Sequence, residues 1–486
     1  MDNLKERAIR GTVAKLTSQG GSLVIRVGSI ALLARLLSPD DFGIVAMVVV
    51  VTALFDNLST AGLAQAMVQS PTVTDAQRTN LFWVNVTCGL VFGSICVLAG
   101  GLLASFYGEP ALFWVAPAFG LTILTNSIGV QHSAYLERQL RYVTLAQIEV
   151  MAQFTNAAVA ILFAFLGAGY WALVFGGMAQ SLVSTSALWI ATGWLPGPPQ
   201  RDAPVGALLR FGATVTLNSI VVFFAYNAEK ILIGRFWGAA ALGIYGRAYQ
   251  LINIPTASIH VAIGGVALSS LSRLQNDPPR QRRYFLKGYS LLMSVTVPLT
   301  VFCAVFGNDI IMVMLGPQWG ESVPVFRLLA PTVLIFGLIN PVAALMLASG
   351  LQRRSLHLAI AIAILLLCAI PLGIPYGPTG VAFAISTAMS LWLVPHVIWS
   401  LKGTAIAPRD LFATAGKPLL ATVAAAALAF VVHQTLLGLE WPIVRLAISG
   451  VVMGSLYFGI LLFALGESRS YLNFLRGFGV FQPSPP

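Results

Sequence analysis

The segment LFWVNVTCGLVFGSICVLAGGLLASF, residues 81–106, contains no charged side chain. About 20 apolar residues in a helix are enough to cross the roughly 30 Å hydrocarbon core of a bilayer, so this segment predicts a transmembrane helix. The rest of the chain has the same character, because 57% of its 486 residues are hydrophobic and only 9% are charged. Soluble proteins carry roughly 25% charged residues. The composition therefore predicts a polytopic membrane protein without a large domain outside the membrane.

Apolar runs bounded by charged residues, Pro or Gly predict about fourteen transmembrane helices and an all-α fold. They cover residues 15–36, 42–66, 81–106, 111–134, 143–166, 169–193, 208–233, 242–268, 284–306, 322–348, 356–374, 379–400, 418–437 and 443–465. Since the total is even, both termini are expected on the same side of the membrane.

Basic residues are distributed between the predicted loops in a way that indicates the orientation. Short loops rich in Lys and Arg stay in the cytoplasm. The N-terminus, the even-numbered loops and the C-terminal tail hold 18 of them, namely Lys5, Arg7, Arg10, Arg78, Arg138, Arg141, Arg201, Arg273, Arg280, Arg282, Arg283, Arg353, Arg354, Lys402, Arg409, Lys417, Arg469 and Arg476. The odd-numbered loops hold only Arg235. We therefore expect cytoplasmic termini, and no nucleic-acid partner, which would require a clustered basic patch.

Sequence signals for other functions are lacking. The apolar run after the basic N-terminus is interrupted by Arg26 and has no small-residue cleavage site, so we expect a retained first helix. The four cysteines lie in apolar runs without a CxxC pair, which argues against disulfide and metal sites. No GxxxxGK[ST] phosphate loop occurs, which argues against an ATP-driven pump.

A weak internal repeat suggests two related halves, as in many transporters. The stretch from Ala34 to Ile44 is echoed by the stretch from Gly234 to Ile244, at an offset of 200 residues. We therefore expect two pseudo-symmetric six-helix lobes, residues 1–200 and 201–407. Residues 408–486 would add two C-terminal helices and a cytoplasmic tail.

Several segments are similar to the signature of Wzx-type polysaccharide flippases. They are Tyr226–Arg235 (YNAEKILIGR), Leu242–Leu251, Leu33–Gly43 (LARLLSPDDFG) and Leu268–Asp277 (LSSLSRLQND). This family belongs to the superfamily that also contains multidrug and toxin extruders and the lipid II flippase. The similarity runs over nearly the whole chain. The family usually carries Asp where this chain has Glu229.

The resemblance implies a two-lobed α-helical transporter that works by alternating access in a bacterial inner membrane. Its substrate would be an undecaprenyl-pyrophosphate-linked sugar repeat unit, moved from the cytoplasmic to the periplasmic leaflet for exopolysaccharide, capsule or O-antigen synthesis. Besides membrane lipids, the polymerase and the chain-length regulator of the same pathway would be its partners. We expect no cofactor, and acids within the helices would allow a proton or sodium gradient to drive turnover.

The best candidate for a pyrophosphate contact is Arg26 in the first predicted helix. Arginine stays protonated, and its planar fork fits phosphate oxygens. The polar side chains at Lys15, Gln19, Ser22, Arg26 and Ser29 recur every three or four residues and therefore share one helical face. A guanidinium near mid-bilayer costs about 2.5–3.5 kcal/mol or more if it faces lipid, so this face is expected to line a cavity. The alternative is a structural ion pair.

A second group of basic residues lies near the predicted outer ends of helices: Arg35, Lys230, Arg235, Arg247 and Arg327. Long basic side chains at helix ends often reach the interface without any ligand. Basic residues are nevertheless rare on the outer side of this chain. We expect that some of this group, Lys230 and Arg247 above all, contact the pyrophosphate on its exit.

Three acidic residues fall within predicted helices: Asp56, Glu149 and Glu229. A buried carboxylate can carry a proton, and one surrounded by hydroxyl and amide oxygens can bind sodium. These residues are the candidates for ion coupling, with structural ion pairs as the alternative. No catalytic and no metal-binding residue is predicted.

Two other functions compete with this prediction. A membrane glycan polymerase or ligase would need acids or histidines on a sizeable outer loop, and residues 307–321 offer only Asp309 and Glu321. We therefore expect a protein that is not an enzyme. An ion-coupled multidrug exporter of the same superfamily would favour acids in its cavity over Arg26, because its substrates are mostly cations.

Overall fold

The computed structural model describes residues 20–70, 72–200 and 205–466, except for residues 207, 211, 214–219, 221–222 and 225. Every regular element in this part of the chain is a helix, which confirms the predicted all-α class. Large apolar side chains lie on the outside of the helices: Leu98, Ile190 and Phe463 are 79%, 83% and 84% exposed. Apolar residues exposed in such numbers indicate contact with lipid. The chain is a multi-pass membrane protein.

Nine helical segments of the described residues are long and apolar enough to span a membrane. Two of them, Ser322–Ala348 and Gln352–Leu401, each contain two consecutive α-helices. The predicted helices over residues 15–36 and 208–233 lie partly outside the described residues. The total of fourteen helices therefore stays a prediction.

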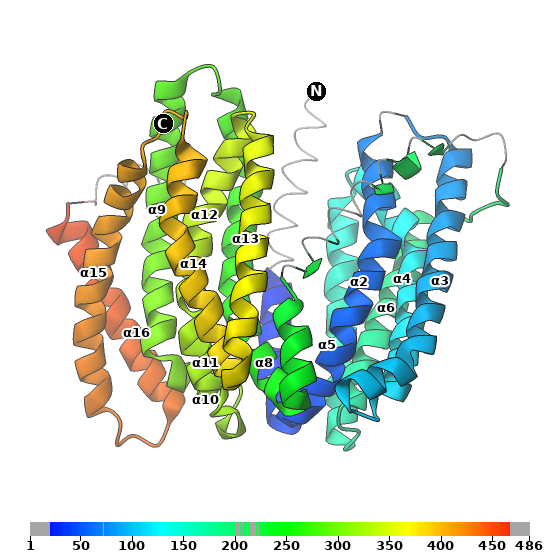
Figure 1. Ribbon diagram of the computed structural model, residues 1–486, viewed down its shortest axis with the longest axis horizontal. Helices are drawn as coiled ribbons and strands as arrows, with labels where there is room; N and C mark the ends of the chain where they lie inside the picture. Colours follow the sequence, from blue (N-terminus) through cyan, green and yellow to red (C-terminus); the bar gives the residue numbers. More distant parts are fainter. Residues whose placement is uncertain are drawn as a thin grey trace, which may run out of the picture. The chain divides into compact units, whose positions relative to one another are not determined.

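The chain divides into two compact units, of which the first contains the described residues up to Gly246 together with Met314–Gln318. It holds a helix over residues 20–36 and the helices α2 (Pro39–Gln69), α3 (Asp75–Tyr107), α4 (Leu112–Arg138), α5 (Tyr142–Phe165) and α6 (Trp171–Thr192). Helix α4 is central, since it packs against α2, α3 and α6, and α5 packs mainly on α6 (Figure 1).

Side-chain caps begin α2 and α3. The hydroxyl of Ser38 accepts a hydrogen bond from the amide of Asp41 at 3.2 Å, and the Asp41 carboxylate accepts one from the amide of Ser38 at 2.9 Å. Thr74 and Gln77 form the same reciprocal pair at the start of α3. Such capping boxes satisfy amides that have no partner within the helix.

Two glycines four residues apart on α3, Gly89 and Gly93, lie close to α4. A Cβ atom at Gly93 would lie 2.8 Å from the carbonyl oxygen of Gly120, and one at Gly89 would lie 2.5 Å from the hydroxyl of Ser127. These glycines therefore allow α3 and α4 to approach each other closely. Gly450 and Gly454 have the same spacing, but no atom lies within 4 Å of a Cβ atom placed at Gly454, so this pair does not mark a similar close approach.

The two segments of the internal repeat contact each other within the first unit, and the contact is reciprocal. A Cβ atom at Gly43 would lie 1.7 Å from the carbonyl oxygen of Ala239, and one at Gly243 would lie 1.9 Å from that of Pro39. Both pairs of equivalent positions are 200 residues apart. Because only glycine permits so close an approach of two backbones, the glycine of each repeat segment makes room for the other segment.

The segment predicted as two helices, residues 208–233 and 242–268, has different boundaries. A turn at Tyr226 and Asn227 precedes α8 (Ala228–Arg273), and Gly238 interrupts α8 with a φ of 79°. A positive φ is readily adopted only by glycine, so the break falls there. The break falls within the loop predicted between the two helices, residues 234–241.

The second unit contains the remaining described residues from Arg247 onward. Its helices are the rest of α8 and then α9 (Pro278–Val305), α10 (Gly307–Met314), α11 (Ser322–Leu329), α12 (Pro331–Ala348), α13 (Gln352–Gly373), α14 (Gly377–Leu401), α15 (Pro408–Thr435) and α16 (Pro442–Gly459), with the short helices η2 (Ile374–Tyr376) and η3 (Ile460–Ala464). The end of α10 at Met314, and Pro317 and Gln318 of the short helix η1 (Pro317–Trp319), belong to the first unit. Helix α15 packs against α9 and α16. Its contact face is a row of fully buried alanines, Ala421, Ala425 and Ala429.

Candidate functional site

Arg26 lies in the helix over residues 20–36 and shares a face with Ser22, which is half-buried. The Arg26 side chain is exposed, and among the described residues it forms no ion pair. Gln19, predicted on the same face, lies outside the described residues. The structural alternative for Arg26, a carboxylate partner, therefore finds no support in the described part of the chain.

Arg35 and Arg235 occupy equivalent positions of the repeat, and both are exposed in the first unit. The guanidinium of Arg235 lies 5.5 Å from the ring centroid of Phe106 and 6.0 Å from that of Phe236. A cation over an aromatic face at an exposed site is stabilised by about 0.5–1 kcal/mol. The aromatic rings thus hold this guanidinium without neutralising its charge.

Lys230 and Arg247, the other predicted basic residues, have polar partners close in the sequence. The Lys230 ammonium donates to the amide oxygen of Asn227 at 2.8 Å, and the Arg247 guanidinium donates to the amide oxygen of Gln250. Lys230 belongs to the first unit and Arg247 to the second. Both side chains are therefore held by polar groups close in the sequence, and their contact with the pyrophosphate stays a prediction.

Asp56 takes part in a polar chain that crosses three helices of the first unit. Its carboxylate accepts a hydrogen bond from Asn126 of α4 at 3.1 Å. The amide oxygen of Asn126 in turn accepts one from the hydroxyl of Ser181 of α6 at 2.6 Å. The neighbouring helices α4 and α6 therefore supply polar groups next to Asp56.

Glu229 is 3% exposed and lies in the first turn of α8. The amides of a first turn have no partner within the helix, and the helix dipole favours a negative charge there. This position gives the carboxylate a structural role at the helix start. Its role in ion coupling stays a prediction.

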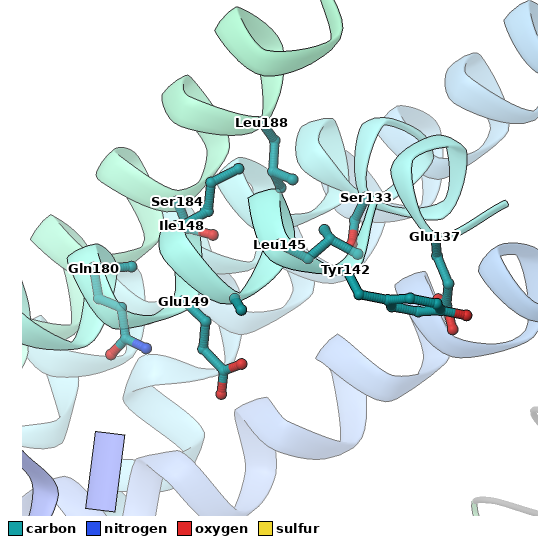
Figure 2. Close-up of a pocket in the computed structure, with 11 residues that line it drawn as sticks. Ser133, Glu137, Tyr142, Leu145, Ile148, Glu149, Gln180, Ser184 and Leu188 are labelled. Atoms are coloured by element: carbon teal, nitrogen blue, oxygen red, sulfur yellow. The ribbon is translucent and has the colours of Figure 1, made fainter. Parts of the chain in front are cut away.

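A polar pocket surrounds Glu149 in the first unit (Figure 2). It has a volume of about 350 Å³ and lies between α4, α5 and α6. It is lined by Ser133, Glu137, Tyr142, Leu145, Ala146, Ile148, Glu149, Ala152, Gln180, Ser184 and Leu188. Figure 2 shows the polar ends of Glu149 and Gln180 pointing the same way, with Glu137 and Tyr142 at the far side of the pocket from Gln180.

Among these lining residues the sequence singled out only Glu149. The polar side chains that it missed recur at a spacing of four, at Ser133 and Glu137 on α4 and at Gln180 and Ser184 on α6. Residues four apart lie on one face of a helix, so this spacing was the available signal. It does not reveal that the faces of α4, α5 and α6 meet around one space.

The carboxylate of Glu149 is exposed and has no partner among the described residues. The nearby arginines are engaged elsewhere: Arg138 donates to the carbonyl oxygens of Met67 and Ser70 at 2.8 and 2.6 Å, and Arg141 donates to that of Ala191 at 3.1 Å. Glu149 lies seven residues into α5, roughly 10 Å from the helix start. An unpaired carboxylate at this depth costs several kcal/mol in lipid, so water has to reach it.

The second unit contains an ionic cluster that the sequence did not predict. Asp309 of α10 is 1% exposed, and its carboxylate lies 2.9 Å from the guanidinium of Arg445 on α16 and 3.7 Å from the imidazole of His433 on α15. Arg445 also donates to the carbonyl oxygens of Leu437 and Leu439, at 3.4 and 3.3 Å. The cluster therefore joins the last two helices to α10.

Comparison with known proteins identifies relatives in polysaccharide synthesis. Residues 32–324, more than half of the chain, match the family described as "Polysaccharide biosynthesis protein". The chain is 26% identical to the lipopolysaccharide biosynthesis protein WzxC of Escherichia coli over 72% of its length and 71% of that protein. It is also 26% identical to the teichuronic acid biosynthesis protein TuaB of Bacillus subtilis, over 67% and 68% of the two chains.

Two groups of solved structures share the fold. The lipid II flippase MurJ, in an inward closed conformation, matches 94% of this chain and 99% of its own with a TM-score of 0.73 and 13% identity. An inward-facing multidrug resistance transporter of the MATE family matches 83% of this chain and 99% of its own, with a TM-score of 0.60 and 13% identity. At these identities the matches establish a common helical fold.

Proposed function

The chain belongs to the polysaccharide biosynthesis protein family, and from this premise we propose that it is a lipid-linked oligosaccharide flippase. It would translocate undecaprenyl-pyrophosphate-linked sugar repeat units from the cytoplasmic to the periplasmic leaflet by alternating access. The repeat units would serve the synthesis of exopolysaccharide, capsule or O-antigen. Named relatives in lipopolysaccharide and teichuronic acid biosynthesis support this proposal.

The observation that carries the proposal is the uncompensated guanidinium of Arg26 in an apolar helix. A pyrophosphate cannot cross a hydrocarbon layer unless fixed positive charges and water replace its hydration shell. Arg26 offers five N–H donors and a permanent charge, and no described carboxylate competes for it. Arg35, Arg235, Lys230 and Arg247 would receive the same group later on its path.

The distribution of basic residues supports an orientation with both termini in the cytoplasm. In a bacterial inner membrane, α4 would then end and α5 would begin on the cytoplasmic side. The pocket around Glu149 would open toward the side on which lipid-linked sugars are assembled. The polymerase and chain-length regulator of the pathway would act on the periplasmic side.

Movement against a gradient requires an energy source, and we assign this role to a proton or sodium gradient. The candidates for the coupling group are Asp56, Glu149 and Glu229. Asp56 fits best, because its amide and hydroxyl neighbours on α4 and α6 form a polar chain through the helix bundle. A change in the charge of Asp56 would therefore alter the hydrogen bonds that link α2, α4 and α6.

The test is export of polymer in a strain from which the gene for this protein has been removed. Arg26→Ala is expected to abolish export while the variant is still inserted in the membrane, and Arg26→Lys is expected to restore part of it. Arg353→Ala, at an exposed arginine, is the matched control and should export normally. Full export by Arg26→Ala would remove Arg26 from the mechanism.

An ion-coupled exporter of cationic drugs is the second candidate. The observation in its favour is the pair of carboxylates, Glu137 and Glu149, in one pocket. A drug-resistance assay on the same strains separates the two functions. Resistance conferred without any rescue of polymer export would favour the exporter.

A further inference from the structure

We infer that the pocket between α4, α5 and α6 binds a neutral sugar ring of the transported oligosaccharide and excludes acidic sugars. The inference rests on the proposed function and adds a glycan subsite to it, separate from the basic residues assigned to the pyrophosphate. Its basis is the pocket's size, its mixture of polar and apolar groups, and its negative charge.

The volume of the pocket fits a small organic molecule. Small-molecule sites range from roughly 300 to 1,000 Å³, and the pocket, at about 350 Å³, lies at the lower end of this range. A bare cation requires oxygen ligands within about 2.6 Å on several sides, which so wide a space does not provide. Nor do the described residues contain a group of three or more His, Cys, Asp or Glu side chains that could hold a metal ion. One sugar ring or a disaccharide is the ligand of matching size.

The polar groups of the pocket complement sugar hydroxyls. The carboxylates of Glu137 and Glu149 can only accept hydrogen bonds, while the hydroxyls of Ser133 and Ser184 both donate and accept. The amide oxygen of Gln180 is already engaged, because it accepts from Asn156 at 2.7 Å. This bond fixes the orientation of the Gln180 amide, so its NH₂ group is available as a donor.

The apolar groups of the pocket fit the carbon side of a sugar ring. Leu145, Ile148 and Leu188 contribute aliphatic surface, and Tyr142 adds an aromatic face. A sugar presents C–H groups as well as hydroxyls. The C–H groups can pack against these apolar side chains and leave water, while the polar groups of the pocket replace the hydrogen bonds that the hydroxyls made to water.

The negative charge of the pocket decides which sugars fit. Glu137 and Glu149 have no cationic partner among the described residues, and Arg138 and Arg141 are bound to backbone carbonyl groups. A uronic acid would bring a third carboxylate into this space, and like charges at close range cost several kcal/mol. A hydroxyl, in contrast, donates a strong charge-assisted hydrogen bond to a carboxylate. The pocket should therefore prefer neutral sugars.

The test measures sugar binding to the full chain in lipid nanodiscs by saturation-transfer difference NMR. The probes are a panel of neutral methyl hexosides and a methyl glucuronoside. Neutral hexosides should give signals and the glucuronoside should not. Ser184→Leu fills the pocket and should weaken the neutral signal at least about tenfold, as expected for lost hydrogen bonds to a bound ligand. Ser186→Leu is the matched control, since Ser186 lies on the same helix but is exposed and outside the pocket.

The charge argument has its own readout in the same experiment. The double variant Glu137→Gln/Glu149→Gln should raise the glucuronoside signal relative to the neutral signal, which a merely structural role of the two residues would not do. Equal signals from wild type and Ser184→Leu would overturn the inference. The inference would also be overturned if no sugar probe bound while the cation tetraphenylphosphonium did. That result would assign the pocket to cations.

Flipping of lipid-linked oligosaccharide in proteoliposomes separates this inference from the proposed function. If wild type and Ser184→Leu flip the lipid equally well, the glycan subsite is refuted and the flippase function stands. If wild type binds neutral hexosides but flips no lipid-linked oligosaccharide, the pocket's ligand is supported and the proposed function fails.

Discussion

Two carboxylates in helical parts of this protein have opposite surroundings. Asp309 of the second unit is 1% exposed and is held between Arg445 and His433. Glu149 of the first unit faces a pocket of about 350 Å³ and has no partner among the described residues. The first carboxylate is compensated inside the protein, whereas the second depends on water or a ligand.

The difference separates structural from functional charge. A buried ion pair fixes how helices dock, because removing one partner leaves the other without compensation. An unpaired carboxylate beside a cavity does not stabilise the fold, and its presence requires another reason. The comparison therefore predicts that stability and transport depend on different residues. The expected loss of stability on substitution is largest at Arg445 and smallest at Glu149.

The largest loss of stability is expected for Arg445→Gln. This change leaves the buried Asp309 without its guanidinium partner, with only the His433 imidazole 3.7 Å away, and should lower the free energy of unfolding by about 3–5 kcal/mol. Unfolding of the purified protein in mixed micelles measures it. Asp309→Asn/Arg445→Gln removes both charges and should be less destabilising than Arg445→Gln alone. A loss below about 1 kcal/mol for Arg445→Gln would show that the cluster does not hold the last helices.

An intermediate loss is expected for Arg78→Lys in the first unit. The Arg78 guanidinium lies 4.3 Å from the ring centroid of Tyr135 and 4.1 Å from that of Trp194, and it pairs with Asp75 at 3.0 Å. Lysine keeps the charge but cannot stack as a plane, so we expect a loss of about 1–2 kcal/mol in the same unfolding experiment. Arg353→Lys, at an exposed position, should change nothing. If Arg78→Lys and Arg353→Lys were equally stable, stacking of Arg78 on Tyr135 and Trp194 would contribute no stability.

Apolar runs were sufficient to predict most helices, because the membrane imposes one simple requirement on their composition. The run over residues 143–166 predicted α5, which spans Tyr142–Phe165. The run over residues 81–106 missed the first turns of α3, which begins at Asp75 because Thr74 and Gln77 cap it. Polar caps lie outside an apolar run, so a scan for apolar residues does not detect them.

The sites were harder to predict than the helices, because they depend on how helices rotate and pack. The acid Glu149 was recognisable as an ionisable group in an apolar helix, but its neighbours Gln180 and Ser184 come from α6. Asp309 was assigned to an outer loop, and its partner Arg445 lies 136 residues later. Spacing along one helix carries no information about contacts over such distances in the sequence.

The smallest effect on stability, and the sharpest test of the comparison, is expected for Glu149→Gln. The change removes a charge that has no described partner, so the free energy of unfolding should stay within about 0.5 kcal/mol of wild type or rise. Flipping of lipid-linked oligosaccharide in proteoliposomes should nevertheless fall roughly tenfold, as expected when a charged hydrogen-bond acceptor for the substrate is lost. Glu321→Gln, at an exposed acid of the second unit, should affect neither quantity. If Glu149→Gln destabilised the protein as strongly as Arg445→Gln, Glu149 would be a structural charge like Asp309, and the distinction between the two carboxylates would be lost.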